Sequence, residues 1–411
     1  MEKETTFRDS MSVFREGVFA RFMVAEFVSM VGTWMQAQAQ QFVVEEHASS
    51  SWEQAVISGV TMLLVPLFSP FGGTLADRSD KRRILFVVLG IQSLLAVLVG
   101  WWLHVGILSF WLLLPVAALL GVSGGFEMPA YAALLPELVP KKKLAAAVAI
   151  DRSVFHSARI IGPALAGWLV GWLGTESAFY ANALSYLCPL LVLCTLAPRK
   201  QGTVEQEAMR RGGFADGLRH VRSDAPTRRM VLLMAACALF CSPFVVVMLT
   251  WYGRRTLGLT PGMVGGLMSL SGFGALLASL LLLGIPSRRR VLFLRIGATL
   301  SVLAMVGLAA AHFFWQAALC VSVLTLGLNF LFGIGNQLVQ ERAPDEIRGR
   351  VSAVAALSFV GVMPFSGFAV AGLEHWMGMR NALLVCAAGY ALVSATMLSR
   401  RWPVSAGAGE S

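Results

Sequence analysis

Five ionisable residues interrupt otherwise apolar stretches of the sequence, and their side chains can carry charge or protons. A charged side chain in a hydrocarbon layer is costly unless it faces water or a partner, so such residues are functional candidates. Burial disfavours the ionised form of a carboxyl group, whereas a nearby arginine favours it. A buried acid without a cation beside it can therefore exchange protons at physiological pH. The five residues are Glu26, Glu127, Asp151, Arg152 and Arg159.

Glu26 is the first candidate for a proton carrier, because the nearest cation in the sequence is Arg21, about one helical turn away. Glu127 is the second candidate. At a rise of about 1.5 Å per residue, these acids and Asp151 lie on the order of 10 Å below the predicted cytoplasmic surface, so they are expected to form one buried cluster. An alternative stays open, in which Arg159 forms salt bridges with Glu127 or Asp151 that only hold the helices together.

The apolar stretches themselves are long enough to be membrane-spanning helices. Of the 411 residues, 56% are hydrophobic and 14% are charged, compared with about 45–50% and about 25% in soluble domains. The runs are continuous over about 20 residues, the length of a helix that crosses a bilayer. They lack the alternation of a β-barrel. The sequence predicts an all-α integral membrane protein with twelve transmembrane helices, at 18–43, 54–76, 84–103, 109–134, 144–172, 177–197, 230–252, 262–284, 291–311, 315–340, 350–373 and 380–399.

The net charge of +10 reflects membrane topology rather than nucleic-acid binding. Suppose that both termini and every second loop between the predicted spans lie on one side of the membrane. Nearly all basic residues of the loops are then on that side. The other side then holds only Arg254, Arg255 and Arg380. Cytoplasmic connections carry such an excess of positive charge. We therefore expect a multi-pass protein of the cytoplasmic (inner) membrane, with the lipid bilayer as a partner, both termini in the cytoplasm and no cleavable signal before the first span.

The chain divides into two related halves. Its longest polar stretch, 198–229, separates six predicted spans in 1–197 from six in 230–411. The halves match at an offset near 204–206 residues, and Pro-Glu-Leu-Val-Pro at 136–140 corresponds to Gln-Glu-Arg-Ala-Pro at 340–344. Transporters are often built from such repeats, with the substrate bound near mid-membrane between them. The expected organisation is an N-terminal six-helix bundle, a cytoplasmic linker, and a C-terminal six-helix bundle with a short tail.

Four short motifs carry a family resemblance. Gly-Thr-Leu-Ala-Asp-Arg-Ser-Asp-Lys-Arg-Arg at 73–83 resembles motif A of the major facilitator superfamily, and Ser-Ala-Arg-Ile-Ile-Gly-Pro at 157–163 resembles motif C, the antiporter motif. Segments at 32–36 and 340–351 are similar to those of the branch with enterobactin and other siderophore exporters and macrolide and multidrug efflux pumps. The resemblance covers essentially the whole chain. The motif C candidates are Gly162, Pro163 and Gly167.

Two departures from the superfamily pattern concern proton coupling. Motif B would place an arginine in the fourth predicted span, but the sequence at 119–127, Leu-Leu-Gly-Val-Ser-Gly-Gly-Phe-Glu, has none. In the second half, the segment at 284–290 ends in three arginines and lacks the motif A acid. A proton mechanism therefore does not follow from the resemblance alone.

The charged motifs predict a conformational latch. The resemblance implies that Asp77 meets the beginning of the eleventh predicted span, where a helix N-terminus favours a carboxylate. We expect Glu137 to pair with Arg78 or Arg82, and Glu341 with Arg288 or Arg289. The alternative is a set of exposed ion pairs worth about 0–1 kcal/mol each. The latch candidates are Gly73, Asp77, Arg78, Arg82, Arg83, Glu137, Glu341, Arg348, Gly349 and Arg350.

Uncharged polar and aromatic side chains are candidates for the substrate cavity, because the resemblance implies that the first, fourth, seventh and tenth spans line it. A few hydrogen-bonding groups among aromatic rings suit a mostly apolar ligand. Membrane-interface anchoring or packing is the alternative role of the aromatic residues. The cavity candidates are Trp34, Gln36, Gln40, Phe126, Asn329, Asn336 and Gln337.

The predicted function is export of a small amphipathic molecule, a drug-like compound or a siderophore, by alternating access. Proton-coupled antiport is the expected mechanism, with a proton or another ion as the coupling partner, in a protein expected to be monomeric. Uptake or facilitated diffusion of a metabolite is one alternative, and a transporter-like sensor or scaffold is another. The sequence contains no P-loop and no His-Glu-x-x-His motif. We therefore expect no enzymatic activity, no cofactor and no metal site.

Overall fold

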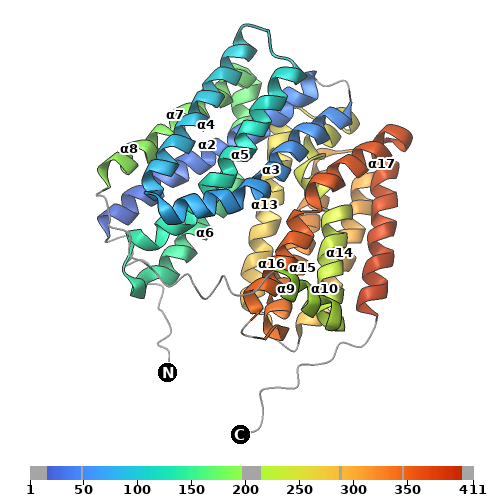
Figure 1. Ribbon diagram of the computed structural model, residues 1–411. Helices are drawn as coiled ribbons and strands as arrows, with labels where there is room; N and C mark the ends of the chain where they lie inside the picture. Colours follow the sequence, from blue (N-terminus) through green and yellow to red (C-terminus); the bar gives the residue numbers. More distant parts are fainter. Residues whose placement is uncertain (1–15, 48–49, 197–213, 287–288, 345–346, 400–411) are drawn as a thin grey trace. The chain divides into compact units, whose positions relative to one another are not determined.

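The computed structural model describes residues 16–47, 50–196, 214–286, 289–344 and 347–399. Every regular element within these ranges is helical (Figure 1). The chain forms two compact units. Of the described residues, the first unit takes in those up to 196 together with 253–269, and the second takes in those from 214 to 252 and from 270 to 399.

The first unit is built from long helices joined by short turns. Asp80 caps the third long helix by accepting a hydrogen bond from the backbone N–H of Arg82 at 3.1 Å, as N-terminal capping residues do. Gly174, with φ of +86°, ends one helix and leads directly into the next. The helices are α2 (Gly17–His47), α3 (Ser51–Arg78), α4 (Lys81–His104), α5 (Phe110–Leu134), α6 (Leu144–Leu173), α7 (Thr175–Ser185), α8 (Leu187–Thr195) and the first part of α13 (Pro261–Leu283), with 3-10 turns η2 (Leu135–Leu138) and η3 (Lys141–Lys143).

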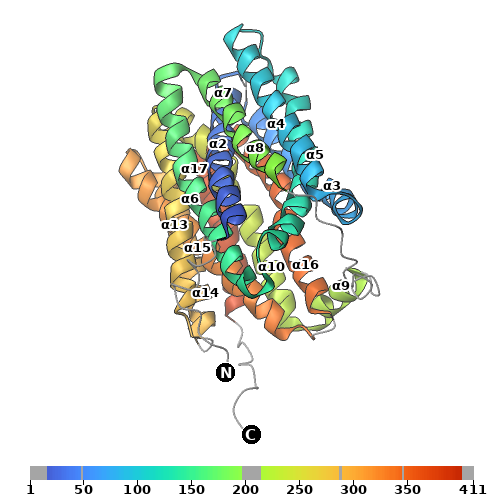
Figure 2. The ribbon, with the colours of Figure 1, turned by 90° about the vertical axis from the view of Figure 1, so that its left-hand side faces the viewer.

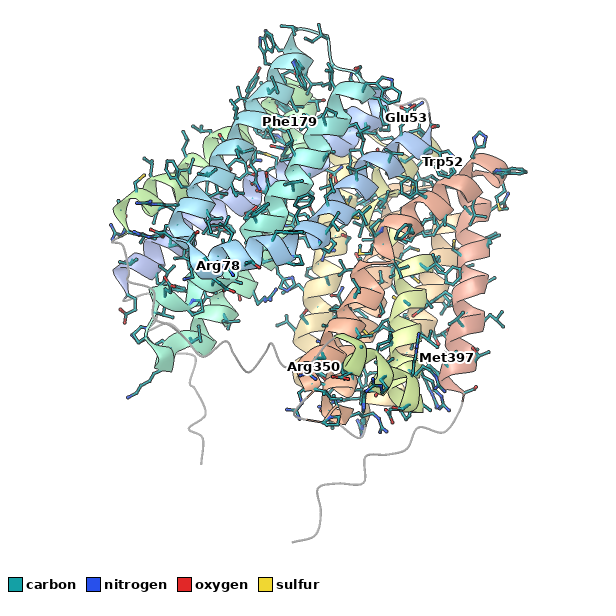
Figure 3. All side chains as sticks on the ribbon, viewed as in Figure 1. Trp52, Glu53, Arg78, Phe179, Arg350 and Met397 are labelled. Carbon is teal, nitrogen blue, oxygen red and sulfur yellow. The ribbon has the colours of Figure 1, made fainter. Side chains whose placement is uncertain are left out.

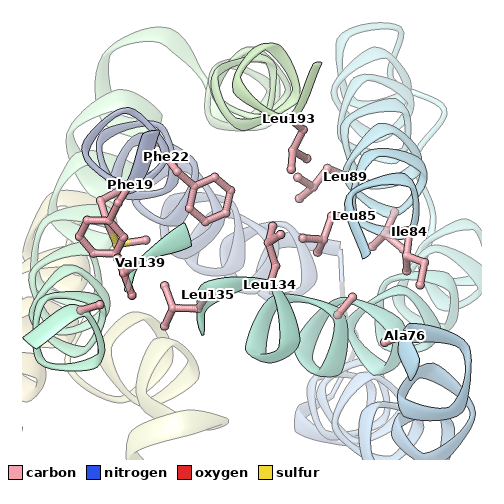
Figure 4. Close-up of a cluster of buried hydrophobic side chains, with 14 of the residues drawn as sticks. Phe19, Phe22, Ala76, Ile84, Leu85, Leu89, Leu134, Leu135, Val139 and Leu193 are labelled. Carbon is pink, nitrogen blue, oxygen red and sulfur yellow. The ribbon is translucent and has the colours of Figure 1, made fainter. Parts of the chain in front are cut away.

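Helix α2 lies at the centre of the first unit's packing, along α6 and α7 (Figure 2). Its aromatic side chains Phe19 and Phe22 belong to a cluster of buried side chains that also includes Leu85 of α4, Leu134 of α5 and Leu193 of α8 (Figure 4). Aromatic and aliphatic side chains of this size supply most of the apolar area that stabilises a helix bundle. This core supports the residues of α2, α5 and α6 that the sequence analysis places inside the membrane.

Helices α3 and α5 pack closely because glycines line their contact. A Cβ on Gly121 would lie 2.8 Å from the carbonyl oxygen of Thr61, and one on Gly125 would lie 2.7 Å from Cβ of Phe68. The Thr61 hydroxyl donates a hydrogen bond to the Ala117 carbonyl oxygen across the same contact, at 3.1 Å. Small residues and hydroxyl groups hold membrane helices together in this way.

The second unit contains one broken helical region and one kinked helix. Residues 225–256 form a series of helical segments instead of one span, and Pro243, which lacks a backbone N–H, begins the segment that follows α10. Gly378 interrupts the last helix with φ of +77°. The elements are α9 (Phe214–Ser223), α10 (Ala225–Phe240), α11 (Pro243–Val246), α12 (Leu249–Trp251), the π-helical turn η5 (Tyr252–Thr256), which begins in this unit, the rest of α13, α14 (Arg290–Ala310), α15 (Phe314–Arg342), α16 (Arg348–Val360) and α17 (Met363–Leu398).

Nine segments of the described chain are long and apolar enough to cross a membrane. The spans expected at 144–172 and 230–252 are helical, but they are not among the nine. The spans expected at 350–373 and 380–399 fall within a single segment, Arg348–Leu398. The all-helical membrane fold is therefore confirmed, and the total of twelve crossings stays a prediction.

Labelled side chains in Figure 3 mark the ends of helices in each unit. In the first unit, Trp52 and Glu53 lie at one end of α3 and Arg78 lies at the other (Figure 3). In the second unit, Arg350 near the start of α16 and Met397 near the end of α17 lie at the same end (Figure 3).

Candidate functional site

Three carboxyl groups from three helices form an acid cluster in the first unit. Glu26 of α2, Glu127 of α5 and Asp151 of α6 lie close enough for the charges of Glu127 and Asp151 to act on Glu26. The prediction that these acids share one region is consistent with this arrangement. The acid cluster, as we call these three residues, rests on the core shown in Figure 4, against which Phe126 and Tyr131 pack.

The three acids differ in how they are held. Gln92 of α4 donates a hydrogen bond to Glu127 Oε2 at 2.7 Å. The Tyr131 hydroxyl donates one to Asp151 Oδ1 at 2.5 Å. Glu26 is only 7% exposed, and within the part of the chain that the structure describes it forms neither a hydrogen bond nor an ion pair. Arg21, its neighbour in the sequence, instead donates to the Gly17 carbonyl oxygen at 3.2 Å.

The arginines of α6 do not neutralise the acid cluster. The guanidinium of Arg159 lies 5.6 Å from the ring centre of Trp34, in a cation–π contact. Among the described residues it forms an ion pair with neither Glu127 nor Asp151. Arg152 is exposed. One face of α6 therefore contributes an acid to the acid cluster, while Arg159 contacts an aromatic ring of α2.

At the end of the first unit near Arg78, a second set of charges surrounds the motif A segment. Lys81 forms an ion pair with Glu137 at 2.8 Å, where we expected Arg78 or Arg82 to be the partner. Arg82 instead bonds to Asp80 and to the Leu196 carbonyl oxygen. Lys81 is the first residue of α4, and its long side chain extends to Glu137 in η2. The predicted helix ends did not indicate that Lys81 would be the nearest basic residue.

The charges of this segment are fixed by local contacts. The hydrogen bond from the Arg82 side chain holds the pKa of Asp80 below its ordinary value. Gly73 lies within α3, and Asp77 and Arg78 are exposed in its last turn, while Arg83 lies in the first turn of α4.

The second unit has a comparable set of charges at the end where α15 finishes and α16 begins. Glu341 pairs with Arg290, the residue that follows the expected Arg289, whereas the other expected partner, Arg288, lies outside the described residues. The Arg342 guanidinium donates two hydrogen bonds of 2.9 Å to Asp224, and these, with help from Thr227, hold the pKa of Asp224 well below its ordinary value. Arg350 contacts Asp216 of α9 at 3.1 Å.

Two other latch candidates begin α16. Arg348 donates to the Gln340 carbonyl oxygen at 3.1 Å, and Gly349 is exposed. The contact of Arg348 was not expected from the sequence, because it depends on where α16 begins relative to the end of α15.

The motif C residues lie at close helix contacts of the first unit. A Cβ on Gly162 would lie 2.8 Å from the Val31 carbonyl oxygen of α2. A Cβ on Gly167 would lie 2.7 Å from the Pro261 carbonyl oxygen at the start of α13, and the carbonyl of Pro163 faces Gly265 in the same contact. A side chain larger than hydrogen therefore has no room at Gly162 or Gly167 of α6, or at Gly265 of α13.

The predicted cavity residues are divided between the two units. In the first unit, Gln36 is buried and accepts a hydrogen bond of 2.7 Å from Asn182, whereas Gln40 and Phe126 are half-buried. Trp34 contacts Arg159, as described above. In the second unit, Asn329 donates to the Thr325 carbonyl oxygen at 2.8 Å, Asn336 is half-buried and Gln337 is exposed.

Several polar residues that hold these sites were not predicted from the sequence. Gln92 was hidden in an apolar run, where a single amide gives little signal. Asp80 and Asp224 each precede a helix as capping residues do, and that pattern was available. Glu45, near the end of α2, is buried and binds Arg255 Nε at 2.5 Å and Arg254 Nε at 3.2 Å within the same unit. Which basic residues pair with Glu45 depends on tertiary contacts, and the local sequence around Glu45 does not indicate them.

No three histidine, cysteine, aspartate or glutamate side chains are placed to hold a metal ion in the described ranges. The features that remain are a buried acid cluster in a helix bundle, charged residues at its end and glycine-lined helix contacts. A sequence profile of the transmembrane secretion effectors matches residues 8–409 of the chain. The chain belongs to the transmembrane secretion effector family of the major facilitator superfamily. It is a multi-pass membrane transporter, not an enzyme.

Relatives of this transmembrane secretion effector include exporters. The chain is 26% identical over 399 residues to the MFS-type transporter YfiS of Bacillus subtilis (strain 168), covering 89% of this chain and 88% of YfiS. It is 24% identical over 342 residues to the multidrug resistance protein MdtG of Dickeya zeae (strain Ech586), covering 80% of each protein. It is 20% identical over 391 residues to macrolide efflux protein A of Streptococcus pyogenes, covering 90% of this chain and 94% of that protein.

Solved structures share the fold of this transmembrane secretion effector. The nucleoside transporter NupG aligns with a TM-score of 0.72 at 13% identity, over 93% of this chain and 98% of NupG. A bacterial homologue of the human lysosomal transporter Spinster aligns with a TM-score of 0.70 at 16% identity, over 95% of this chain and 98% of that chain. At these identities the alignments establish the fold alone.

Proposed function

We propose that this protein exports small amphipathic molecules from the cytoplasm in exchange for protons. The observation that carries the proposal is Glu26, a buried carboxyl group that has no ion-pair partner among the described residues, beside Glu127 and Asp151. Intramembrane acids in such surroundings mark proton relays in transporters. The multidrug and macrolide efflux relatives support export as the direction of transport. A drug-like compound or a siderophore is the proposed cargo.

In this mechanism, Glu26 binds a proton when the first unit opens to the acidic outer side and releases it when the unit opens to the cytoplasm. Glu127 and Asp151 are the other two acids of the cluster. Gln92 and Tyr131 hold the other two acids in place. Substrate and proton then leave and enter in alternate half-cycles.

The proposed frame is a pair of six-helix bundles, 1–197 and 230–411, joined by the linker 198–229 and embedded in the inner membrane with both termini in the cytoplasm. The charged residues at the ends of α3, α15 and α16 would form the latch of one state, with Asp77 at its centre. Their shared location at helix ends supports this role. The glycines of α6 would seal the helix contacts against leakage, and the half-buried polar groups named above would line the cavity.

The experiment that tests proton coupling uses purified protein in proteoliposomes with an imposed pH gradient. Chloramphenicol, an uncharged amphipathic drug, and the dye ethidium are the transported probes, and a pH-sensitive dye reports proton movement. We expect gradient-driven transport of at least one probe together with counter-movement of protons. Glu26→Gln should abolish the gradient-driven component, while Glu176→Gln, which changes an acid of α7 outside the acid cluster, should leave it intact. Normal gradient-driven transport by Glu26→Gln would remove Glu26 from the mechanism.

A further inference from the structure

Three basic side chains share one face of α6, and the proposed proton exchange does not use them. Arg152, His156 and Arg159 follow one another at intervals of four and three residues, so they lie on the same face of the helix. The charges of both arginines act on His156, so the three side chains lie close together. We call these three residues the basic face. Arg159 lies near the middle of the 30-residue helix α6, which packs along the apolar helix α2.

No carboxylate neutralises the basic face in the described part of the chain. Neither Arg152 nor Arg159 forms an ion pair or a hydrogen bond with a described residue. Asp151, which precedes Arg152, accepts the hydrogen bond of the Tyr131 hydroxyl instead. An arginine among membrane helices is costly unless it faces water or a partner of opposite charge. The basic face is therefore expected to meet water or a negatively charged ligand rather than lipid.

The contact with Trp34 compensates Arg159 only in part. The guanidinium lies 5.6 Å from the centre of the indole ring and is attracted to the ring face. This contact leaves the five N–H donors of the guanidinium without acceptor oxygens. His156 is in a similar position, because its Nδ1 is buried and has no hydrogen-bond partner among the described residues. Both side chains can therefore donate hydrogen bonds to the oxygen atoms of a ligand.

Aromatic rings lie beside these donors. The rings of Trp34 and Phe155 meet nearly at right angles, with their centres 5.7 Å apart. The ring of Phe155 also contacts the imidazole of His156, at a distance of 5.6 Å between ring centres. These three side chains and Arg159 are half-buried, and Arg152 is exposed, so a ligand can approach the basic face.

This combination of groups indicates the chemistry of the ligand. A guanidinium binds a carboxylate through two parallel hydrogen bonds, which gives both charge and shape recognition. Apolar and aromatic walls with a few polar groups suit a ligand whose body is mostly apolar. A ligand that matches both features has a carboxylate attached to an apolar or aromatic body.

We propose that the basic face binds the carboxylate of an amphipathic organic anion. Arg159 pairs with the carboxylate and His156 donates a hydrogen bond to it. The rings of Trp34 and Phe155 contact the apolar body, and the exposed charge of Arg152 attracts the anion to the site. This proposal rests on the proposed export function and names the substrate class as amphipathic carboxylates. Cargo and proton then use different side chains of the first unit, the basic face and the acid cluster.

The test is direct binding of tritiated 1-naphthoate to full-length protein, measured by scintillation proximity at neutral pH. The protein is held in nanodiscs of phosphatidylcholine, which has no net charge, and empty nanodiscs provide the correction. The matched control ligand is 1-naphthamide, an uncharged amide of nearly the same size and shape. We expect 1-naphthoate to bind and 1-naphthamide to compete at least about tenfold more weakly, because the amide lacks the charge-assisted contact with the guanidinium.

Variants locate the site. Arg159→Gln should weaken 1-naphthoate binding by about tenfold or more, and Arg159→Lys should restore part of it, because lysine keeps the charge but not the two parallel donors. His156→Ala removes no hydrogen bond of the described structure and should weaken binding about two- to tenfold. Arg21→Gln, which changes an exposed arginine of α2, should bind like the unmodified protein.

Three results would overturn the anion site. They are the absence of 1-naphthoate binding above that of empty nanodiscs, equal affinities for 1-naphthoate and 1-naphthamide, and full binding by Arg159→Gln. The comparison of the two ligands uses unmodified protein, so it decides the question even if Arg159→Gln fails to fold.

The outcomes separate this inference from the proposed function. If a proton gradient drives chloramphenicol transport but 1-naphthoate does not bind, the anion site is wrong and proton-coupled export stands. If 1-naphthoate binds with the expected dependence on Arg159 but no gradient moves chloramphenicol or ethidium, the anion site stands and proton-coupled export is wrong.

Discussion

Gly167→Ala, in the motif C segment of α6, is the substitution whose effect follows most directly from the structure. The added Cβ would lie 2.7 Å from the Pro261 carbonyl oxygen, 3.0 Å from Cα of Gly262 and 3.2 Å from Cα of Gly265. All three neighbours are backbone atoms, which cannot rotate away as a side chain would. The two helices must therefore separate, and overpacking of this kind costs about 1–3 kcal/mol.

Gly171→Ala is the matched control, one turn further along the same helix. Its Cβ would meet nothing within 4 Å. Alanine is favoured over glycine in a helix by about 1 kcal/mol, so this variant should be as stable as the unmodified protein or more stable. Since the helix preference is the same at both positions, the difference between the two variants isolates the contact with α13. We expect that difference to be about 1–3 kcal/mol.

Both variants can be compared by thermal unfolding with a thiol-reactive fluorophore, in a background in which the exposed Cys194 and the half-buried Cys188 and Cys320 are replaced by serine. The buried Cys237 and Cys241 then report the opening of the fold. Proton leak in proteoliposomes without substrate gives the functional comparison. We expect Gly167→Ala to unfold at a lower temperature and to leak faster than Gly171→Ala. Equal stability and equal leak would refute the account of this contact as a tight backbone seam.

Two other expected outcomes concern charges at the helix ends. Asp77→Asn should slow transport while leaving expression near normal, because the carboxylate is expected to act in one transport state rather than in folding, and unchanged transport rates in proteoliposomes would exclude Asp77 from a latch. The Asp224–Arg342 pair should stabilise the fold fully above about pH 4 and lose its effect as the pH falls toward the lowered pKa of Asp224. Asp224→Asn should therefore reduce stability at pH 7 but change it little at the acid limit, and an equal loss at both pH values in unfolding experiments would contradict the ion pair's role.

The sequence predicted the helices well where apolar length alone decides the outcome. The expected spans at 84–103, 109–134 and 291–311 lie within a few residues of α4, α5 and α14. The prediction from the sequence was wrong where a helix is interrupted within an apolar stretch. The region predicted as one span at 230–252 is divided near Pro243, and hydropathy does not register that interruption.

The acid cluster was predictable because ionisable residues are rare in apolar runs. Their partners were not. Glu137 and Glu341 bind Lys81 and Arg290 rather than the expected arginines, since long basic side chains reach several positions along a helix and the choice among them depends on tertiary packing. The cation–π contact of Arg159 likewise depends on the approach of α6 to α2, which the spacing of charges does not indicate.

One set of ion pairs occurs in both units and bears on how the chain is assembled. Glu16, just before α2, binds Lys143 just before α6 at 2.9 Å. Asp216, in the short helix α9 before α10, binds Arg350 at the start of α16. In each unit, an acid that precedes the first long helix thus forms an ion pair with a basic residue at the start of a later helix. The polar segment before the first long helix is therefore linked to the rest of its bundle. The short helix α9 is therefore a structural part of the second unit.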